Sequence, residues 1–280
     1  MRIHHLNCAT MCPPSRRLVN GTGGLFEAGR MVCHCLLVET DDGLVLVDSG
    51  FGTADVRDPA ASLGARFLRT TRPRLDMNET AVAQVAALGY RPEDVRHIVL
   101  THLDLDHAGG LGDFPWATVH VHATEYEAAL RRESAGEQRR YRPNHWAHGP
   151  NWATYPSADG EKWFGFDAVR QLRGLPPEIL LVPLAGHSRG HTGVAIDTGD
   201  RWLLHAGDAY FFHGEADPVR PASTPFLGLF QTMVQIDGRA RRANQARLRE
   251  LRAAHGDRVE VFCAHDEVEL ARYTRTAERT

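Results

Sequence analysis

The sequence predicts an α/β domain, and three observations support this fold class. Short apolar runs typical of buried strands alternate with segments of helical periodicity along the chain. Several of these apolar runs end directly in loops of glycine and polar residues, which is where α/β folds place their chemistry. No shift in composition marks a domain boundary, so we expect a single domain over residues 1–280.

The first predicted elements lead into a polar cluster. Strands are expected over residues 32–38 and 44–48, and the second ends at Asp48 in a glycine-rich loop. Residues 79–88 have the periodicity of a helix. A buried strand is expected over residues 96–101, and it continues without a spacer into a run of His and Asp.

The next segment contains a strand over residues 117–122, a helix over 123–132 and an insertion over 133–167. The insertion is rich in aromatic residues and Arg and has no clean period, so we interpret it as a long surface excursion of functional importance. Its rings would line an apolar pocket or pack the insertion onto the domain, and its arginines would clamp an anion. The residues concerned are Arg139, Arg140, Tyr141, Arg142, His145, Trp146, His148, Trp152, Tyr155, Trp163 and Phe164.

Regular structure resumes after the insertion. An arginine-rich helix is expected over residues 238–255, with its basic side chains on a solvated face. The remaining predicted strands cover residues 179–183, 193–197, 201–206 and 258–263.

Composition excludes several classes of protein. The chain has 280 residues, of which 42% are hydrophobic and 24% are charged, which excludes wholesale disorder, collagen and coiled coil. The net charge of −3 argues against nucleic acid as a partner, because phosphate binding requires a basic surface. There are 16 histidines, and because histidine is the commonest metal ligand, their placement needs an explanation.

Neither a membrane span nor a disulfide framework is expected. Apolar runs stay below the roughly 18 residues of a transmembrane helix, and the first residues lack the core of a secretory signal. An odd number of cysteines indicates reduced thiols, so we expect a cytoplasmic protein. The spacing of the first four does not favour a zinc site, although it leaves their role open; they are Cys8, Cys12, Cys33 and Cys35.

Four side chains of metal-ligand type lie within six residues after a buried strand: His102, Asp104, Asp106 and His107. Residues two apart on extended backbone point to the same side, so the first three can project together. The glycines that follow permit a tight bend that brings in His107. Because neighbouring carboxylates repel each other, the cluster favours a divalent cation over a polar loop with two helix-capping aspartates.

Three further apolar strands end in residues of the same kind. His187 follows the strand over 179–183, Asp208 follows the strand over 201–206, and His265 ends the last strand. A single strand end of this kind is more often structural. Four of them in one chain indicate a composite metal site.

Taken in this order, the motifs resemble those of the metallo-β-lactamase superfamily of metallohydrolases. That family carries an Asp after an early strand, a His-x-His-x-Asp-His motif, a Gly-His, a bridging Asp and a final His. The resemblance covers residues from about 32 to 268, and it departs at Asp104, where most members have His. The matching residues are Asp48, His102, Asp104, Asp106, His107, Gly186, His187, Asp208 and His265.

The resemblance implies a fold and two ligand sets. The fold would be an αβ/βα four-layer sandwich, with two facing mixed β-sheets, helices outside and metals at one sheet edge. His102, Asp104 and His187 would hold a first metal, Asp106, His107 and His265 a second, and Asp208 would bridge them.

Two such cations lower the pKa of a shared water towards about 7, which is the chemistry of a hydrolase. Asp106 and Asp208 are then the expected catalytic carboxylates. Zinc is the expected metal, but Asp104 adds a hard ligand that makes manganese or iron alternatives. The same substitution could leave the first site weakly bound.

Four residues near the ligands are candidates for supporting roles. Asp48, His191 and Asp266 would orient ligating histidines through hydrogen bonds, or else only cap and pack their loops. Tyr210, two residues after Asp208, would hydrogen-bond a developing oxyanion, or else be a half-buried aromatic.

The sequence favours a hydrolase of esters or lactones that resembles the lactonases of acyl-homoserine lactones. Its substrate would be a small molecule with an apolar or aromatic part. The alternatives are a glyoxalase II-like thioesterase and, from another class, a di-iron oxidoreductase, since the flavodiiron proteins also replace the second motif histidine with a carboxylate. We expect no nucleic-acid or membrane partner and leave open whether the chain forms a homodimer.

Overall fold

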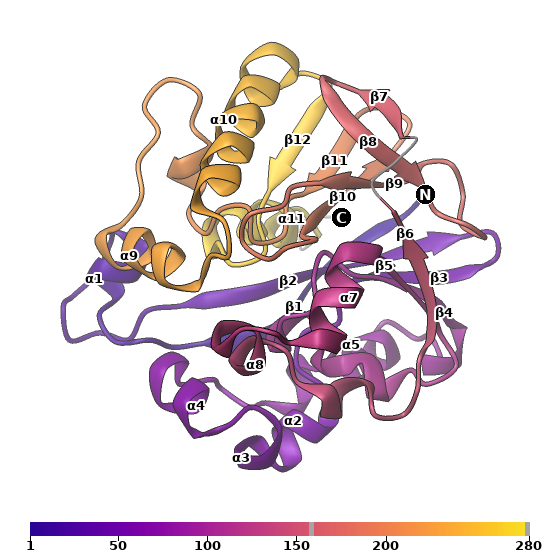
Figure 1. The fold of residues 1–280 in the computed structure, drawn as a ribbon, viewed down its shortest axis with the longest axis horizontal. Helices are drawn as coiled ribbons and strands as arrows, with labels where there is room; N and C mark the ends of the chain where they lie inside the picture. Colours follow the sequence, from indigo (N-terminus) through magenta and orange to yellow (C-terminus); the bar gives the residue numbers. More distant parts are fainter. Residues whose placement is uncertain (157–159, 278–280) are drawn as a thin grey trace.

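Two six-stranded β-sheets form the centre of the molecule (Figure 1). The computed structural model describes residues 1–156 and 160–277. The first half of the chain builds one sheet and the second half builds the other, and helices cover the outer faces (Figure 1). The predicted αβ/βα sandwich is confirmed.

The first sheet has the order β1-β2-β3-β4-β5-β6. Its first three strands are antiparallel, and β3 to β6 run parallel. The central strands are continuous apolar runs because both of their faces are buried. The strands are β1 (Ile3–Met11), β2 (Met31–Thr40), β3 (Gly43–Val47), β4 (Val95–Val99), β5 (Thr118–His122) and β6 (Asn151–Tyr155).

The second sheet has the order β12-β11-β10-β9-β8-β7. Neighbours are antiparallel from β7 to β11, and β11 pairs with β12 in parallel. The strands are β7 (Glu161–Trp163), β8 (Phe166–Gln171), β9 (Ile179–Pro183), β10 (Thr192–Asp197), β11 (Trp202–His205) and β12 (Val259–Phe262).

The core consists of layers that follow from strand alternation. On β2, Leu36 and Val38 pack between the two sheets, against residues such as Leu181 of β9. Their neighbour Leu37 points the opposite way, into the layer under the helices that cover the first sheet. Leu248 of α10 packs in the corresponding layer outside the second sheet. Each sheet is therefore buried on both faces.

The longest described helix is α10, which covers the second sheet beside β12 (Figure 1). The described α-helices are α1 (Arg16–Asn20), α2 (Thr53–Arg57), α3 (Pro59–Ser62), α4 (Ala65–Thr71), α5 (Ala81–Ala87), α6 (Leu105–Ala108), α7 (Ala123–Arg131), α8 (Ala135–Arg140), α9 (Pro225–Val234), α10 (Gly238–His255) and α11 (Glu267–Ala277). Within the described part of the chain, no helix is both long and apolar enough to cross a bilayer.

Two expectations about the elements were wrong. The insertion over residues 133–167 is not an irregular excursion, because it contains α8, β6 and β7 and supplies edge strands to both sheets. The basic face of α10 is not wholly solvated either. Arg241 is buried and donates hydrogen bonds to Gln231 and Gln235.

Candidate metal centre

The sequence-predicted ligands meet at one edge of the two sheets. His102, Asp104 and α6, which carries Asp106 and His107, follow the end of β4. The three other ligands come from the second sheet, where His187 follows β9, Asp208 follows β11 and His265 follows β12. The structure therefore brings together side chains from both halves of the chain.

Four side chains form what we call the first ligand group: His102, Asp104, His187 and Asp208. His102 Nε2 lies 3.4 Å from Asp104 Oδ2 and 3.7 Å from Asp208 Oδ2. His187 Nε2 lies 3.0 Å and 3.3 Å from the same two oxygens. The four atoms thus surround one point between them.

The second ligand group comprises Asp106, His107, His265 and again Asp208. The other oxygen of Asp208, Oδ1, lies 3.3 Å from His107 Nε2 and 3.1 Å from His265 Nε2. Asp106 lies at the rim of this group, with its Oδ2 3.7 Å from His265 Nε2. Asp208 therefore turns one oxygen toward each group, which is the geometry of a bridging carboxylate.

The donor set fits divalent cations. Ligands about 2.0–2.1 Å from a tetrahedral metal lie about 3.3 Å from one another, which is close to the separations found here. Among the described residues, three buried ligand atoms have no hydrogen-bond partner: His102 Nε2, His107 Nε2 and Asp208 Oδ1. Buried polar atoms are normally satisfied, so these atoms are the ones that a cation would complete.

Hydrogen bonds on the far side of the rings fix which nitrogen faces the site. His107 donates from Nδ1 to Asp48 Oδ2, which lies 2.8 Å away. Asp48 also accepts the Thr101 backbone N–H and hydroxyl, and that hydroxyl in turn accepts from His102 Nδ1. His265 donates from Nδ1 to the carbonyl of Val32. In all three rings Nε2 is thereby the nitrogen that faces the site and is available to a cation.

His191 holds the backbone of Asp208 and lies outside both ligand groups. Its Nδ1 donates to the Leu184 carbonyl, and its Nε2 accepts the Asp208 N–H at 2.8 Å. Gly207 has a φ of +52°, and a Cβ at this position would collide with His191 Nε2. A left-handed glycine thus lets the chain turn tightly enough for Asp208 to point between the groups. We expected His191 to orient a ligating histidine or only to pack its loop, whereas its ring hydrogen-bonds the loop before His187 and the backbone of Asp208.

Glu125 on α7 ties three separate segments to the centre, and sequence reasoning missed it. Its Oε1 accepts the Leu103 N–H and the Tyr141 hydroxyl, and its Oε2 accepts the Ser188 hydroxyl and the Gly190 N–H. The side chain is fully buried. It thereby sets the loop before Asp104 and the loop after His187 in one position. A lone Glu in a helical stretch carries no sequence signal for this role.

Arg140 is the second residue whose role was missed. Its Nη1 lies 2.9 Å and 2.7 Å from the two oxygens of Asp104, and its Nη2 donates to the Val234 carbonyl. We expected the arginines of the insertion to clamp a substrate anion, whereas this one pairs with an aspartate of the chain itself. The acceptor lies 36 positions away, so no local pattern indicates the pair.

The two groups differ in electrostatic character. Burial, and then the Arg140 guanidinium, lower the pKa of His187 to about 4. Burial alone would also lower the pKa of His265, but Asp208 and Asp106 raise it to about 9. Burial would raise the pKa of Asp104, but Arg140 and His102 hold it well below its usual range. The first group is thus the less attractive of the two for positive charge.

The expectation for Tyr210 does not match its position. Its ring is fully buried in the core outside the second sheet, and its hydroxyl donates to Glu269 at 3.0 Å. The next residue, Phe211, faces the centre instead, because its ring stacks on His265 with centroids 5.1 Å apart and lies 5.7 Å from His187. Phe211 has no hydroxyl to offer an oxyanion. We therefore leave Tyr210 out of the reaction.

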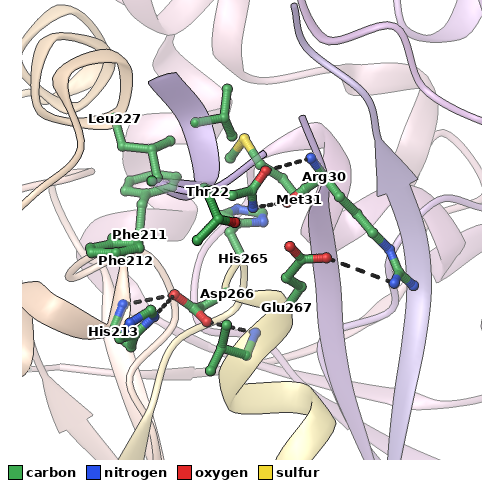
Figure 2. A pocket seen from close by; sticks show the side chains of 14 residues that line it. Thr22, Arg30, Met31, Phe211, Phe212, His213, Leu227, His265, Asp266 and Glu267 are labelled. Atoms are coloured by element: carbon green, nitrogen blue, oxygen red, sulfur yellow. Dashed lines mark hydrogen bonds and ion pairs between the residues drawn. The ribbon is translucent and has the colours of Figure 1, made fainter. Parts of the chain in front are cut away.

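A cavity of about 280 Å³ opens beside His265 (Figure 2). Figure 2 shows Phe211, Phe212 and Leu227 on one side of it and Asp266 with His213 on another. We expected Asp266 to orient a ligating histidine or to cap its loop. Its Oδ2 accepts from the backbone N–H and Nδ1 of His213, which belongs to neither ligand group, and its Oδ1 caps α11. The full lining is Val19, Asn20, Gly21, Thr22, Arg30, Met31, Phe211, Phe212, His213, Leu227, His265, Asp266, Glu267 and Val268.

This lining corrects the prediction that rings of the insertion line the pocket. None of the described residues of this segment, 133–156 and 160–167, borders the cavity. Trp163 and Tyr155 pack in the core layers instead. His145 contacts Asp55 at 2.8 Å, and Arg142 donates to the Leu63 carbonyl.

Cys33 of β2 is buried next to the second ligand group. Its Sγ lies within 4.8 Å of ligand atoms of Asp106 and His265. Burial and the neighbouring Asp106 raise the pKa of its thiol well above the usual range. The described cysteines, Cys8, Cys12, Cys33, Cys35 and Cys263, are all free.

Comparison with known proteins gives a consistent picture. A sequence model of the metallo-beta-lactamase superfamily matches residues 28–259. A protein of Mycobacterium tuberculosis named probable metallo-hydrolase is 43% identical over 267 residues, which cover 95% of this chain and 80% of the relative. The N-acyl homoserine lactonase AiiA of Bacillus thuringiensis subsp. kurstaki is 30% identical over 164 residues, which cover 59% of this chain and 58% of the relative.

Solved structures share the fold. An N-acyl homoserine lactone hydrolase with N-hexanoyl-L-homoserine bound at its catalytic metal centre superimposes with a TM-score of 0.71 at 23% identity, covering 96% of this chain and 95% of its own. The dizinc lactonase AidC superimposes with a TM-score of 0.62 at 17% identity, covering 95% of this chain and 87% of its own. At such identities the likeness shows the fold alone.

Glu125→Gln tests whether the buried carboxylate sets the two ligand loops. The amide nitrogen of Gln cannot accept, so one pair of donors loses its acceptor, which should lower the free energy of unfolding by about 3 kcal/mol and weaken zinc binding. Urea unfolding and zinc titration measure the two effects. Glu127→Gln, on the exposed side of the same helix, is the control. Equal behaviour of the two variants would contradict the role given to Glu125.

Glu269→Gln tests the buried carboxyl beneath Tyr210. Burial, with Asp266 adding to it, raises the pKa of Glu269 to about 7. Because this pKa lies above the unfolded value, the folded state binds the additional proton, and stability falls as the pH rises from about 5 to about 8. Urea unfolding in chelator should show the wild type losing up to ~3 kcal/mol relative to the variant over this range.

The control for this pH dependence is Glu250→Gln, whose side chain is exposed on α10. Its stability should follow that of the wild type at every pH. Parallel curves for wild type and Glu269→Gln would show that the carboxyl does not titrate in this range.

Proposed function

The chain is a metal-dependent hydrolase of the metallo-beta-lactamase superfamily, and from that premise we propose that it uses two divalent cations to hydrolyse an ester or lactone bond. The first and second ligand groups would each hold one cation, with zinc as the expected metal. A substrate carrying an apolar acyl or aryl part would occupy the cavity beside His265.

The position of the Asp208 carboxylate carries this proposal. Its two oxygens face two different pairs of imidazoles, with Nε2–O separations of 3.1–3.7 Å. The side chain is 4% exposed, and one of its oxygens lacks a partner among the described residues. A carboxylate buried among four imidazoles needs positive charge on both of its sides, which two divalent cations would supply.

Two bound divalent cations would supply Lewis acidity and lower the pKa of a water molecule, so that hydroxide would be available near neutral pH. Asp106, at the rim of the second ligand group, has the position to take up a proton there and return it to the leaving oxygen. Asp208, as the shared ligand, keeps the two groups in a fixed position relative to each other. The ring of Phe211 stacks on that of His265 and lies beside that of His187, at the wall of the cavity.

The cavity supports a substrate with an apolar part. It adjoins the second ligand group through His265, and Phe211, Phe212 and Leu227 give it an apolar wall (Figure 2). Its volume of about 280 Å³ suits a short acyl chain or a single aromatic group. Relatives named as acyl homoserine lactonases support a lactone as the first substrate to test.

Asp208→Ala should abolish the metal centre. Both groups lose their shared ligand, so we expect the metal content to fall from about two ions to less than one per chain and activity to fall at least about 100-fold. Elemental analysis and hydrolysis assays measure these effects. Asp257→Ala, an exposed position, should change neither. Retention of two ions by Asp208→Ala would overturn the bridging assignment.

Leu227→Trp tests the cavity as the site of the apolar part. The larger ring would fill space next to His265, so KM for a hexanoyl lactone should rise at least about tenfold while kcat changes little. Leu229→Trp is the matched control, because Leu229 lies on the same helix and is 61% exposed.

A panel of acyl homoserine lactones, aryl esters and a glutathione thioester decides among substrates. Turnover of lactones or aryl esters supports the proposal. Turnover of the thioester alone assigns the chain to the glyoxalase II-like alternative. A zinc-loaded protein that leaves the whole panel intact contradicts the proposed bond class.

A further inference from the structure

The two ligand groups offer the same donors in different surroundings. Each has two imidazole nitrogens, one carboxylate of its own and one oxygen of Asp208. The first group also faces the guanidinium of Arg140. The second group instead lies next to a further carboxylate, that of Asp48, which contacts His107. The charge around the two groups is therefore unequal although their ligands match.

Arg140 is held firmly in this position. Its side chain is 7% exposed, and Nη1 lies within hydrogen-bond distance of both oxygens of Asp104. Nη2 donates to the carbonyl of Val234, the last residue of α9. Because Nη1 and Nη2 both have partners, the position of the guanidinium is fixed by the fold and not by Asp104 alone.

A fixed guanidinium acts on a cation in the first group in two ways. Like charges repel, and they do so more strongly in a buried site than in water. In addition, Oδ2 of Asp104, which lies 3.0 Å from His187 Nε2, is shared with Arg140. Its lone pairs are therefore divided between the guanidinium and any cation bound there.

We propose that Arg140 is a positioning residue that makes the two metal sites unequal, so that the first ligand group binds a divalent cation at least about tenfold more weakly than the second. The inference rests on the proposed function, in that both groups bind cations. The second site would be filled first and the first site would exchange its ion more readily. A cation in the first site would also keep more of its charge, because Arg140 offsets that of Asp104.

A zinc titration of metal-free protein against a chromophoric chelator tests the proposal. The wild type should show two dissociation constants at least tenfold apart. Arg140→Gln removes the charge and should tighten the weaker constant at least tenfold while leaving the tighter one unchanged. Arg140→Lys retains the charge and should keep the constants apart. Arg139→Gln, the exposed neighbour on α8, is the control and should match the wild type.

Crystals of the wild type grown with one equivalent of zinc give a second test that needs no variant. Anomalous density should lie between Asp106, His107 and His265. Density in the first group, equal constants in the wild type, or an Arg140→Gln protein whose weaker constant fails to tighten would overturn the inference. Failure of the wild type to bind zinc at all would instead overturn the proposed function.

Discussion

Negative charge buried at one sheet edge is the constraint on which the rest of this structure depends. Asp104, Asp106 and Asp208 lie within a few ångströms of four imidazoles, and Asp208 is 3% exposed. Carboxylates this close repel one another and lose their hydration, so the chain must supply compensation from elsewhere. One guanidinium pairs with Asp104 directly, and the ring nitrogens that face the site would hold cations, which would offset the remaining charge. The asymmetry of the centre follows from this compensation.

Two buried carboxylates, those of Asp48 and Glu125, hold the ligand loops in place without contacting the ligand atoms that face the metal sites. Asp48 receives donors from residues 101 and 107, and Glu125 receives donors from residues 103, 141, 188 and 190. Each of these carboxylates replaces several weak loop contacts with a fixed set of charge-assisted hydrogen bonds. Gly186 contributes sterically, since a Cβ there would collide with the backbone of α10 at Arg241. The close contact at Gly186 thereby fixes the position of the loop after β9 relative to α10.

Local sequence pattern was sufficient to predict elements whose position depends on neighbouring residues alone. The central strands read as apolar runs, and the ligands after β4 lie close in sequence, so both could be predicted. The edge strands β1 and β6 carry polar residues and could not. Spacing from Asp208 did not tell which ring faces the centre: Tyr210 packs in the core outside the second sheet, and Phe211 stacks on His265. The partner of Asp104 lies on α8, and only the tertiary fold places Arg140 there.

Each ligand group draws two residues from the first half of the chain and two from the second. A cation held by such a group would act as a cross-link between the two sheets, and its binding free energy would add to the apolar packing that joins them. Removal of the metal by a chelator would then weaken the packing between the two sheets as well as stop turnover. The same seven side chains would then both support catalysis and stabilise the contact between the two sheets. The supply of metal would therefore govern the lifetime of the folded protein.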